Sequence, residues 1–300
     1  MRKGEKLENL TSEFTKFIEF LCSEYSRNWA SMAADYETLG VYDEIVQFMG
    51  INSKQLWLDF ACGTGNLISA VRKTSEPFIV GVDYNPHSLD LAAKRLQSEG
   101  HNVNASLDHL VKIYLSPFGF ERIPLAKKGY AIKDEQIDLI MEDLRTLEIL
   151  DEMLKGRKAD VITFSFCGFS STAYFEGNYR LDSHDLAYTS ELYTSPEVAR
   201  RNKEIGLLLR RAVFKQATRF LKDDGQLIYV DRVNKPAHNF ADFYEIALGR
   251  LPLHHLESVS KNVSVGIRQP QNWYGTVRLS VHGSGDVPQE VYIVYSRFRK

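Results

Sequence analysis

The 300-residue sequence has few cysteines, no long apolar run and no excess of either charge. Its three cysteines, Cys22, Cys62 and Cys167, form no closely spaced pair, so neither a disulfide framework nor a metal site is expected. No segment approaches the roughly 18 apolar residues that a membrane helix needs. A formal net charge of −2 excludes a general attraction to nucleic acid. With reduced thiols and a polar N-terminus, the chain is expected to be cytoplasmic, with no membrane partner.

Apolar residues are plentiful, at 44% of the chain, which is enough to build a sizeable core. Between residues 56 and 232, short apolar runs alternate with amphipathic segments, a pattern typical of βαβ units around a parallel sheet. The apolar runs predict strands buried on both faces. They are Leu56–Phe60, Phe78–Asp83, Ile137–Glu142, Ala159–Ser165 and Gln226–Asp231.

The segment before the first strand is expected to be mostly helical. Apolar residues recur at helical spacing in Ser12–Cys22 and in Tyr42–Met49. We therefore expect a helical cap or lid over residues 1–50 and a ligand-binding domain over residues 51–300.

The segment after the central strands predicts a helix and a hairpin. Phe240–Leu251 has helical spacing, whereas Thr276–His282 and Val291–Phe298 alternate like two antiparallel strands at the edge of the sheet. Residues 101–136 and 171–199 are too long to be simple connections, so both are expected to be insertions that are either functional or mobile.

A glycine-rich turn, Asp59-Phe60-Ala61-Cys62-Gly63-Thr64-Gly65, follows the first predicted strand. Glycine permits positive φ and close approach of a ligand, and the next helix offers unpaired N–H groups. Asp83 ends the second predicted strand 20 positions after Gly63, where an acid can accept hydrogen bonds from ribose hydroxyls. A plain strand–helix turn remains an alternative for the loop alone. Loop and acid together predict a ligand that contains ribose.

Two residues near this loop indicate the kind of ribose ligand. Ile68 stands where the NAD fingerprint needs a third small residue, which argues against NAD. The carboxylate of Asp59 would repel a pyrophosphate but could face an ammonium group. The predicted cofactor is therefore cationic at this end.

At these residues the sequence resembles the class I S-adenosylmethionine-dependent methyltransferases. Their first motif, Asp/Glu-x-Gly/Ala-x-Gly-x-Gly, is matched from Asp59 to Gly65, and further matches occur at Gly81-Val82-Asp83, at Asp143 and at residues 221–227. The resemblance covers about residues 40–300. It implies an α/β fold with a Rossmann-like, doubly wound, seven-stranded sheet whose C-terminal strand is antiparallel. It also implies S-adenosylmethionine as cofactor and S-adenosylhomocysteine as product.

The resemblance further implies which residues hold the cofactor. The glycine loop would pack against its methionine part, Asp83 would bind the ribose, and Asp143 with Leu144 would contact the adenine. The full set is Asp59, Ala61, Gly63, Gly65, Asp83, Tyr84, Asp143, Leu144, Phe164 and Ser165, the last two lying under the sulfonium.

The segment after the fourth predicted strand bears on the methyl acceptor. It reads Phe-Ser-Phe-Cys-Gly-Phe over residues 164–169 and lacks the Asp/Asn-Pro-Pro-Tyr signature of many N-methyltransferases. Methyl transfer is an in-line displacement that needs positioning and, for a protonated acceptor, a general base. His184 and Asp185, in the aromatic insertion, are candidates for that base, with a solvated surface pair as the alternative. Cys167 lacks the neighbouring proline of the 5-methylcytosine enzymes and is expected to pack in the core.

Residues 200–222 predict a helix with eight Lys or Arg side chains and one acid, Glu204. This stripe could contact RNA phosphates, or it could be a solvated outer face. The sequence as a whole therefore predicts a methyltransferase that acts on a small molecule. An RNA or protein methyltransferase and a non-catalytic S-adenosylmethionine-binding protein remain alternatives. The sequence leaves the oligomeric state open.

Overall fold

The computed structural model describes part of the chain. The described residues are 23, 26–27, 29–105, 112–116, 119–123, 136–166, 211–233, 249–263 and 292–300. The predicted helix at Ser12–Cys22, the predicted strand at Thr276–His282 and the insertion at 171–199 lie outside them, as does most of Phe240–Leu251.

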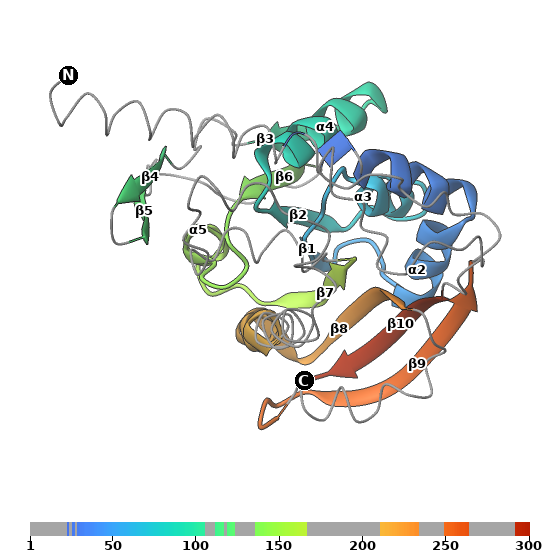
Figure 1. Cartoon of the computed structure of the whole chain (residues 1–300). Helices are drawn as coiled ribbons and strands as arrows, with labels where there is room; N and C mark the ends of the chain where they lie inside the picture. Colours follow the sequence, from blue (N-terminus) through green and yellow to red (C-terminus); the bar gives the residue numbers. More distant parts are fainter. Residues whose placement is uncertain are drawn as a thin grey trace, which may run out of the picture.

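An eight-stranded sheet forms the centre of the molecule, in the order β3-β6-β2-β1-β7-β8-β10-β9 (Figure 1). The strands from β3 to β8 in this order are parallel, and β10 runs antiparallel to both β8 and β9. A separate hairpin pairs β4 with β5. The bounds are β1 Leu56–Phe60, β2 Phe78–Asp83, β3 Asn102–Ala105, β4 Lys112–Ser116, β5 Gly119–Ile123, β6 Gln136–Met141, β7 Ala159–Ser165, β8 Leu221–Val233, β9 His254–Asn262 and β10 Tyr292–Arg299.

Helices cover both faces of the sheet and enclose two hydrophobic clusters. One face carries α2 and α3, with α4, and its cluster includes Trp57 of β1. The other face carries α5 and the helical residues 211–220, and its cluster includes Leu58 of the same strand. The helices are α2 Val41–Met49, α3 Asn66–Arg72, α4 Pro86–Ser98 and α5 Glu148–Leu154, and residues 29–38 are also helical.

The prediction of a doubly wound α/β sheet with an antiparallel C-terminal strand is confirmed. The predicted strands correspond to β1, β2, β6, β7 and β8, because each is apolar on both faces. β8 begins earlier than predicted, at Leu221. Its pairing with β7 shifts from Ala159–Leu221 to Val161–Gln226, so residues 222–225 bulge out of the ladder.

The predicted number of seven strands is wrong, because the described residues already form a sheet of eight. The additional strand, β3, pairs in parallel with β6 at the edge of the sheet, inside the predicted insertion 101–136. Its residues, Asn-Val-Asn-Ala, are exposed or half-buried and therefore have no apolar run to signal a strand.

The C-terminal edge also differs from the predicted pairing. The described neighbours of β10 are β8 and β9. β9 is a mostly exposed edge strand, so the hydrophobic pattern did not indicate it. The helical residues 211–220 end before Lys222, which lies in β8 rather than in the predicted helix 200–222.

Candidate cofactor-binding site

The candidate site lies at the carboxyl ends of β1, β2 and β7. β1 pairs with β2 on one side and with β7 on the other. The chain builds the sheet outward from β1 through β2 and then crosses to β7. This arrangement is the topological switch point where parallel α/β sheets bind ligands. Asp59, the glycine loop, Asp83 and Ser165 all stand at this edge.

The glycine loop after β1 adopts left-handed backbone conformations at three predicted positions. Ala61, Gly63 and Gly65 have φ values of 59°, 54° and 76°. Gly65 is the N-cap of α3, and a Cβ there would lie 3.1 Å from the Cβ of Ala92 in α4. The loop is therefore close-packed at both glycines, against Ala92 of α4 at Gly65 and against the indole of Trp29 at Gly63.

Asp83 connects the end of β2 to the glycine loop. Its carboxylate accepts the backbone N–H of Gly63 at 2.8 Å and that of Asn85 at 2.8 Å. Burial raises the pKa of Asp83, and backbone donors from Asn85, Gly63 and Tyr84 partly offset this rise. The two motifs that the sequence singled out are thus brought into direct contact.

Asp59 is a buried carboxylate with one oxygen that accepts no hydrogen bond from the described residues. The Thr163 hydroxyl donates to its Oδ1 at 2.5 Å and accepts the indole N–H of Trp57 at 2.9 Å. Oδ2 has no hydrogen-bond partner among the described residues. Burial raises the pKa of Asp59 to about 7, the bond from Thr163 lowers it, and the charge of Asp83 raises it. A buried acid with an open oxygen is suited to a cationic donor.

Asp143, which follows β6, forms an ion pair with Arg145. Arg145 donates to both carboxylate oxygens of Asp143, through Nε at 3.0 Å to each and through a terminal nitrogen at 2.7 Å. Leu144 is buried in the cluster that contains α5. Asp143 is therefore held rigidly beside the site by a bidentate ion pair.

The end of β7 presents different residues to the two faces of the sheet. Phe164 is fully buried in the cluster beneath α5 and packs against Tyr229, with ring centroids 5.7 Å apart. Ser165 is buried, and its hydroxyl has no hydrogen-bond partner among the described residues. Alternation along β7 places it on the same face as Thr163 and Asp59. Of the two predicted residues, Ser165 thus offers a polar atom on that face.

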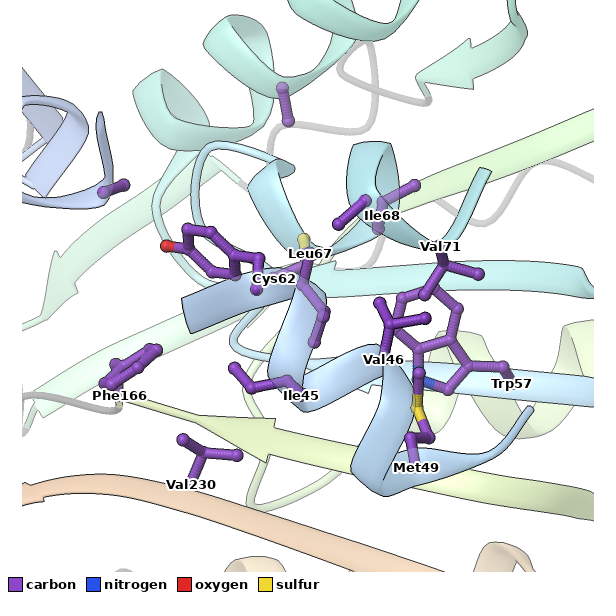
Figure 2. Packing of buried hydrophobic residues seen from close by; sticks show 14 of the residues in the cluster. Ile45, Val46, Met49, Trp57, Cys62, Leu67, Ile68, Val71, Phe166 and Val230 are labelled. Atoms are coloured by element: carbon purple, nitrogen blue, oxygen red, sulfur yellow. The ribbon is translucent and has the colours of Figure 1, made fainter. Parts of the chain in front are cut away.

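Phe166, just beyond β7, packs among aromatic residues near the glycine loop (Figure 2). Its ring stacks on that of Tyr36 at 4.8 Å and lies 5.7 Å from that of Trp29. Cys62, labelled in the same view, is buried, and burial raises the pKa of its thiol well above the usual range. This thiol is therefore protonated at neutral pH and packs as an apolar group.

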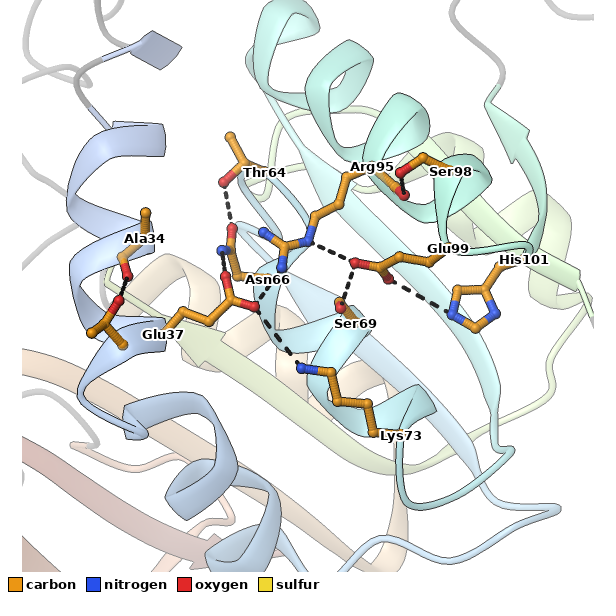
Figure 3. Close-up of polar contacts among 11 residues, drawn as sticks. Ala34, Glu37, Thr64, Asn66, Ser69, Lys73, Arg95, Ser98, Glu99 and His101 are labelled. Carbon is orange, nitrogen blue, oxygen red and sulfur yellow. Dashed lines mark hydrogen bonds and ion pairs between the residues drawn. The ribbon is translucent and has the colours of Figure 1, made fainter.

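The sequence predicted a helical cap over residues 1–50 but placed none of its residues at the glycine loop. Trp29 lies against Gly63, and Glu37 forms a polar network with α3 and α4 (Figure 3). A signal was present, because Trp29, Met32, Ala33 and Tyr36 follow the i, i+3, i+4, i+7 spacing of an amphipathic helix.

The candidate general base lies outside the described residues. His184, Asp185 and Cys167 belong to segments that are not described, so their roles remain predictions. In the described part of the chain, no group of His, Cys, Asp and Glu side chains could hold a metal ion. No described helix is long and apolar enough to cross a membrane.

A comparison with protein families matches residues 58–147 to a methyltransferase domain. These residues contain the glycine loop, Asp83 and Asp143. No curated protein matches the sequence.

Several solved structures have a similar shape at low identity. A putative methyltransferase from Bacillus halodurans is 13% identical, with a TM-score of 0.45, over 86% of this chain and 98% of its own. Magnesium protoporphyrin IX methyltransferase from Synechocystis, with bound S-adenosylmethionine, is 13% identical, with a TM-score of 0.42, over 89% and 80%. TrmN from Thermus thermophilus is 12% identical, with a TM-score of 0.45, over 86% and 48%, so the chain spans about half the length of TrmN.

Proposed function

We propose that this chain, whose residues 58–147 match a methyltransferase domain, is a class I S-adenosylmethionine-dependent methyltransferase that transfers the cofactor's methyl group to a small-molecule acceptor. The observation that carries this proposal is the paired arrangement of Asp59 and Asp83 around the glycine loop. One acid has a buried, open oxygen, and the other is bonded to the loop itself. These features match a ligand with an ammonium group and a ribose.

The described residues fit this cofactor. Asp59 would accept a hydrogen bond from the ammonium group, directly or through water, at the oxygen that no described residue engages. Asp83 would bind the ribose hydroxyls, because each carboxylate oxygen can accept a second hydrogen bond beside its backbone donor. Ala61, Gly63 and Gly65, whose left-handed conformations shape the loop, would line the methionine part of the cofactor. Tyr84, Asp143 and Leu144 would lie toward the adenine.

The cofactor supplies an electrophilic methyl group on a sulfonium, so the protein's task is to place the acceptor in line and to exclude water. Ser165 supports this task, because its buried hydroxyl can hydrogen-bond an acceptor on the face that carries Asp59. Phe164 would support the site from the opposite face of the sheet, where it packs in the cluster beneath α5. His184 and Asp185 would serve as general base where the acceptor carries a proton.

The charge distribution favours a small acceptor over RNA. Of the eight cations in residues 200–222, four lie in the described part of the chain, Arg211, Lys215, Arg219 and Lys222, and two of these four pair with acids. Arg219 pairs with Asp151, and Lys222 pairs with Asp160 at 2.5 Å. Cations that are engaged in this way are less available to phosphates. RNA or protein methylation and cofactor binding without catalysis remain the alternatives for the test.

Calorimetric titration with S-adenosylmethionine, S-adenosylhomocysteine and NAD tests the cofactor. We expect micromolar binding of the first two and none of NAD. Asp83→Asn should weaken binding by about 5- to 150-fold, because a hydrogen-bonded carboxylate contributes ~1–3 kcal/mol. Asp90→Asn is the matched control, since Asp90 lies on α4 and pairs with Lys94 at the surface. Unchanged affinity in Asp83→Asn would remove Asp83 from the site.

Transfer of labelled methyl groups in a fractionated lysate tests the acceptor. Label in the low-molecular-mass fraction supports the proposal, whereas label found only in RNA or in protein overturns it. A salt-sensitive complex with RNA would favour the RNA alternative. Cofactor binding with no transfer to any fraction would favour the non-catalytic alternative.

A further inference from the structure

Trp29 occupies the open side of the glycine loop. A Cβ added to Gly63 would lie 2.6 Å from the indole Nε1 and 3.2 Å from Cδ1. The space that glycine leaves for a ligand is therefore filled by an indole. Two groups cannot share this volume in a close-packed protein, so a ligand that contacts Gly63 must displace the side chain.

Aromatic contacts hold the indole in this position. Its ring lies 5.7 Å from that of Phe166 and 6.2 Å from that of Tyr36, in tilted and edge-on arrangements. Phe166 follows β7, whereas Tyr36 belongs to the same helical segment as Trp29. Such aromatic pairs are individually weak, so the contact is stable and still reversible.

Polar contacts hold the helical residues 29–38 on the ligand-binding elements (Figure 3). Glu37 accepts from Arg95 of α4 at 2.6 Å and from the side chain of Asn66 at 3.1 Å. Asn66 in turn accepts the hydroxyl of Thr64, between the two loop glycines, at 2.6 Å. Glu37 thus links the helical segment to the glycine loop through Asn66.

We propose that Trp29 is a plug that competes with the cofactor for the glycine loop, and that Glu37 is the latch that keeps the plug in place. This inference rests on the proposed function, because the displaced ligand is S-adenosylmethionine or its product. Residues 39–40 form a turn in which Gly40 has a φ of 70° and open space around it. The helical segment can therefore pivot at this turn while α2 remains in the core.

If Trp29 is a plug, removing its side chain should increase cofactor affinity rather than decrease it. An apparent Kd equals the intrinsic Kd divided by the fraction of molecules whose site is open. A substitution that removes the plug raises that fraction and tightens binding. An aromatic side chain that merely stacked on the ligand would have the opposite effect, because its removal would weaken binding.

The test is calorimetric titration of three full-length variants with S-adenosylhomocysteine. We expect Trp29→Ala to bind about five- to tenfold more tightly than the unsubstituted chain, and Glu37→Gln about two- to fivefold more tightly. Glu99→Gln is the matched control and should leave the Kd unchanged. Glu99 belongs to the same network, where it accepts hydrogen bonds from Arg95 and Ser69. Among the described hydrogen bonds, none joins Glu99 to Glu37, Thr64 or Asn66.

The outcomes separate the plug from the proposed function. Weaker or unchanged binding by both Trp29→Ala and Glu37→Gln, with a chain that still binds the ligand, overturns the plug and leaves the function standing. Binding by Trp29→Ala alone, with none by the unsubstituted chain, supports the plug. Absence of binding in all variants overturns both. If Trp29→Ala fails to fold by circular dichroism, the comparison of Glu37→Gln with Glu99→Gln decides.

Discussion

Asp59 changes charge close to neutral pH. Burial raises its pKa to about 7. In the ligand-free chain the carboxyl group is therefore mostly protonated below this value and mostly ionised above it. A cationic ligand needs the ionised form, so the protonated form must lose its proton before the ion pair can form. Affinity for such a ligand should accordingly rise with pH.

Titration of S-adenosylhomocysteine binding from pH 6 to pH 7.5 checks this expectation. With a pKa of about 7, the ionised fraction of Asp59 rises by about eightfold over this interval, and the association constant should rise by a similar factor. Asp59→Asn keeps the size of the side chain and removes the titration, so its weaker binding should be nearly independent of pH. An equally steep rise in Asp59→Asn would assign the pH dependence to another group.

At the scale of single residues, the sequence could predict the features that follow from the spacing of residues along the chain. The interval between Gly63 and Asp83 indicated their joint role, and the structure places the carboxylate of one on the N–H of the other. It could not predict the open oxygen of Asp59, because that depends on Thr163, 104 positions away in the chain. The contact of Trp29 with Gly63 also depends on how a helix docks, which no motif encodes.

Helix α5 begins with a carboxylate cap from Glu142, a residue that follows strand β6. Its N-cap residue, Leu147, makes no side-chain hydrogen bond to the first N–H groups of the helix. Glu142, which follows β6, accepts the backbone N–H of Ile149 at 2.7 Å and that of Leu150 at 3.0 Å. This carboxylate replaces the missing cap and positions α5 against the end of the strand that precedes Asp143.

Glu142→Ala should lower the free energy of unfolding by about 1–3 kcal/mol, because two N–H groups at the helix start lose their acceptor. Glu142→Gln should cost less, since its amide oxygen can still accept one bond. Urea denaturation followed by circular dichroism measures both changes. Glu148→Ala, in the exposed first turn of α5, is the control and should change stability by only about 0.5 kcal/mol or less. A loss in the control as large as that in Glu142→Ala would refute the capping role.

The predictability of each element followed from its burial. The central strands are apolar on both faces, and β1, β2 and β7 were predicted to the residue. The edge strand β3 is mostly half-buried and β9 is mostly exposed, so both carry polar residues and give no apolar run. Their pairing depends on neighbours already in place, which local periodicity cannot reveal.

At the scale of the whole molecule, α2 contacts both the first strand of the sheet, β1, and the C-terminal strands β9 and β10. Its buried face packs in the cluster that contains Trp57 of β1. Its Glu44 accepts from Tyr295 of β10 at 3.2 Å and pairs with Lys261 of β9. The predicted division at residue 50 stays a prediction. These contacts indicate that α2 contributes to the same core as the strands that carry Asp59 and Asp83.

Substitution of Ile45 tests whether that core unfolds as one unit. Ile45 is fully buried, so Ile45→Ala should lower the free energy of unfolding by about 2–5 kcal/mol. Because α2 packs on β1, the change should shift one cooperative transition, seen at the same denaturant concentration by circular dichroism and by tryptophan fluorescence. Gln47→Ala, on the exposed face of α2, should leave that midpoint unchanged. Two separate transitions, with only the weaker one shifted by Ile45→Ala, would instead show that the N-terminal residues form a detachable cap.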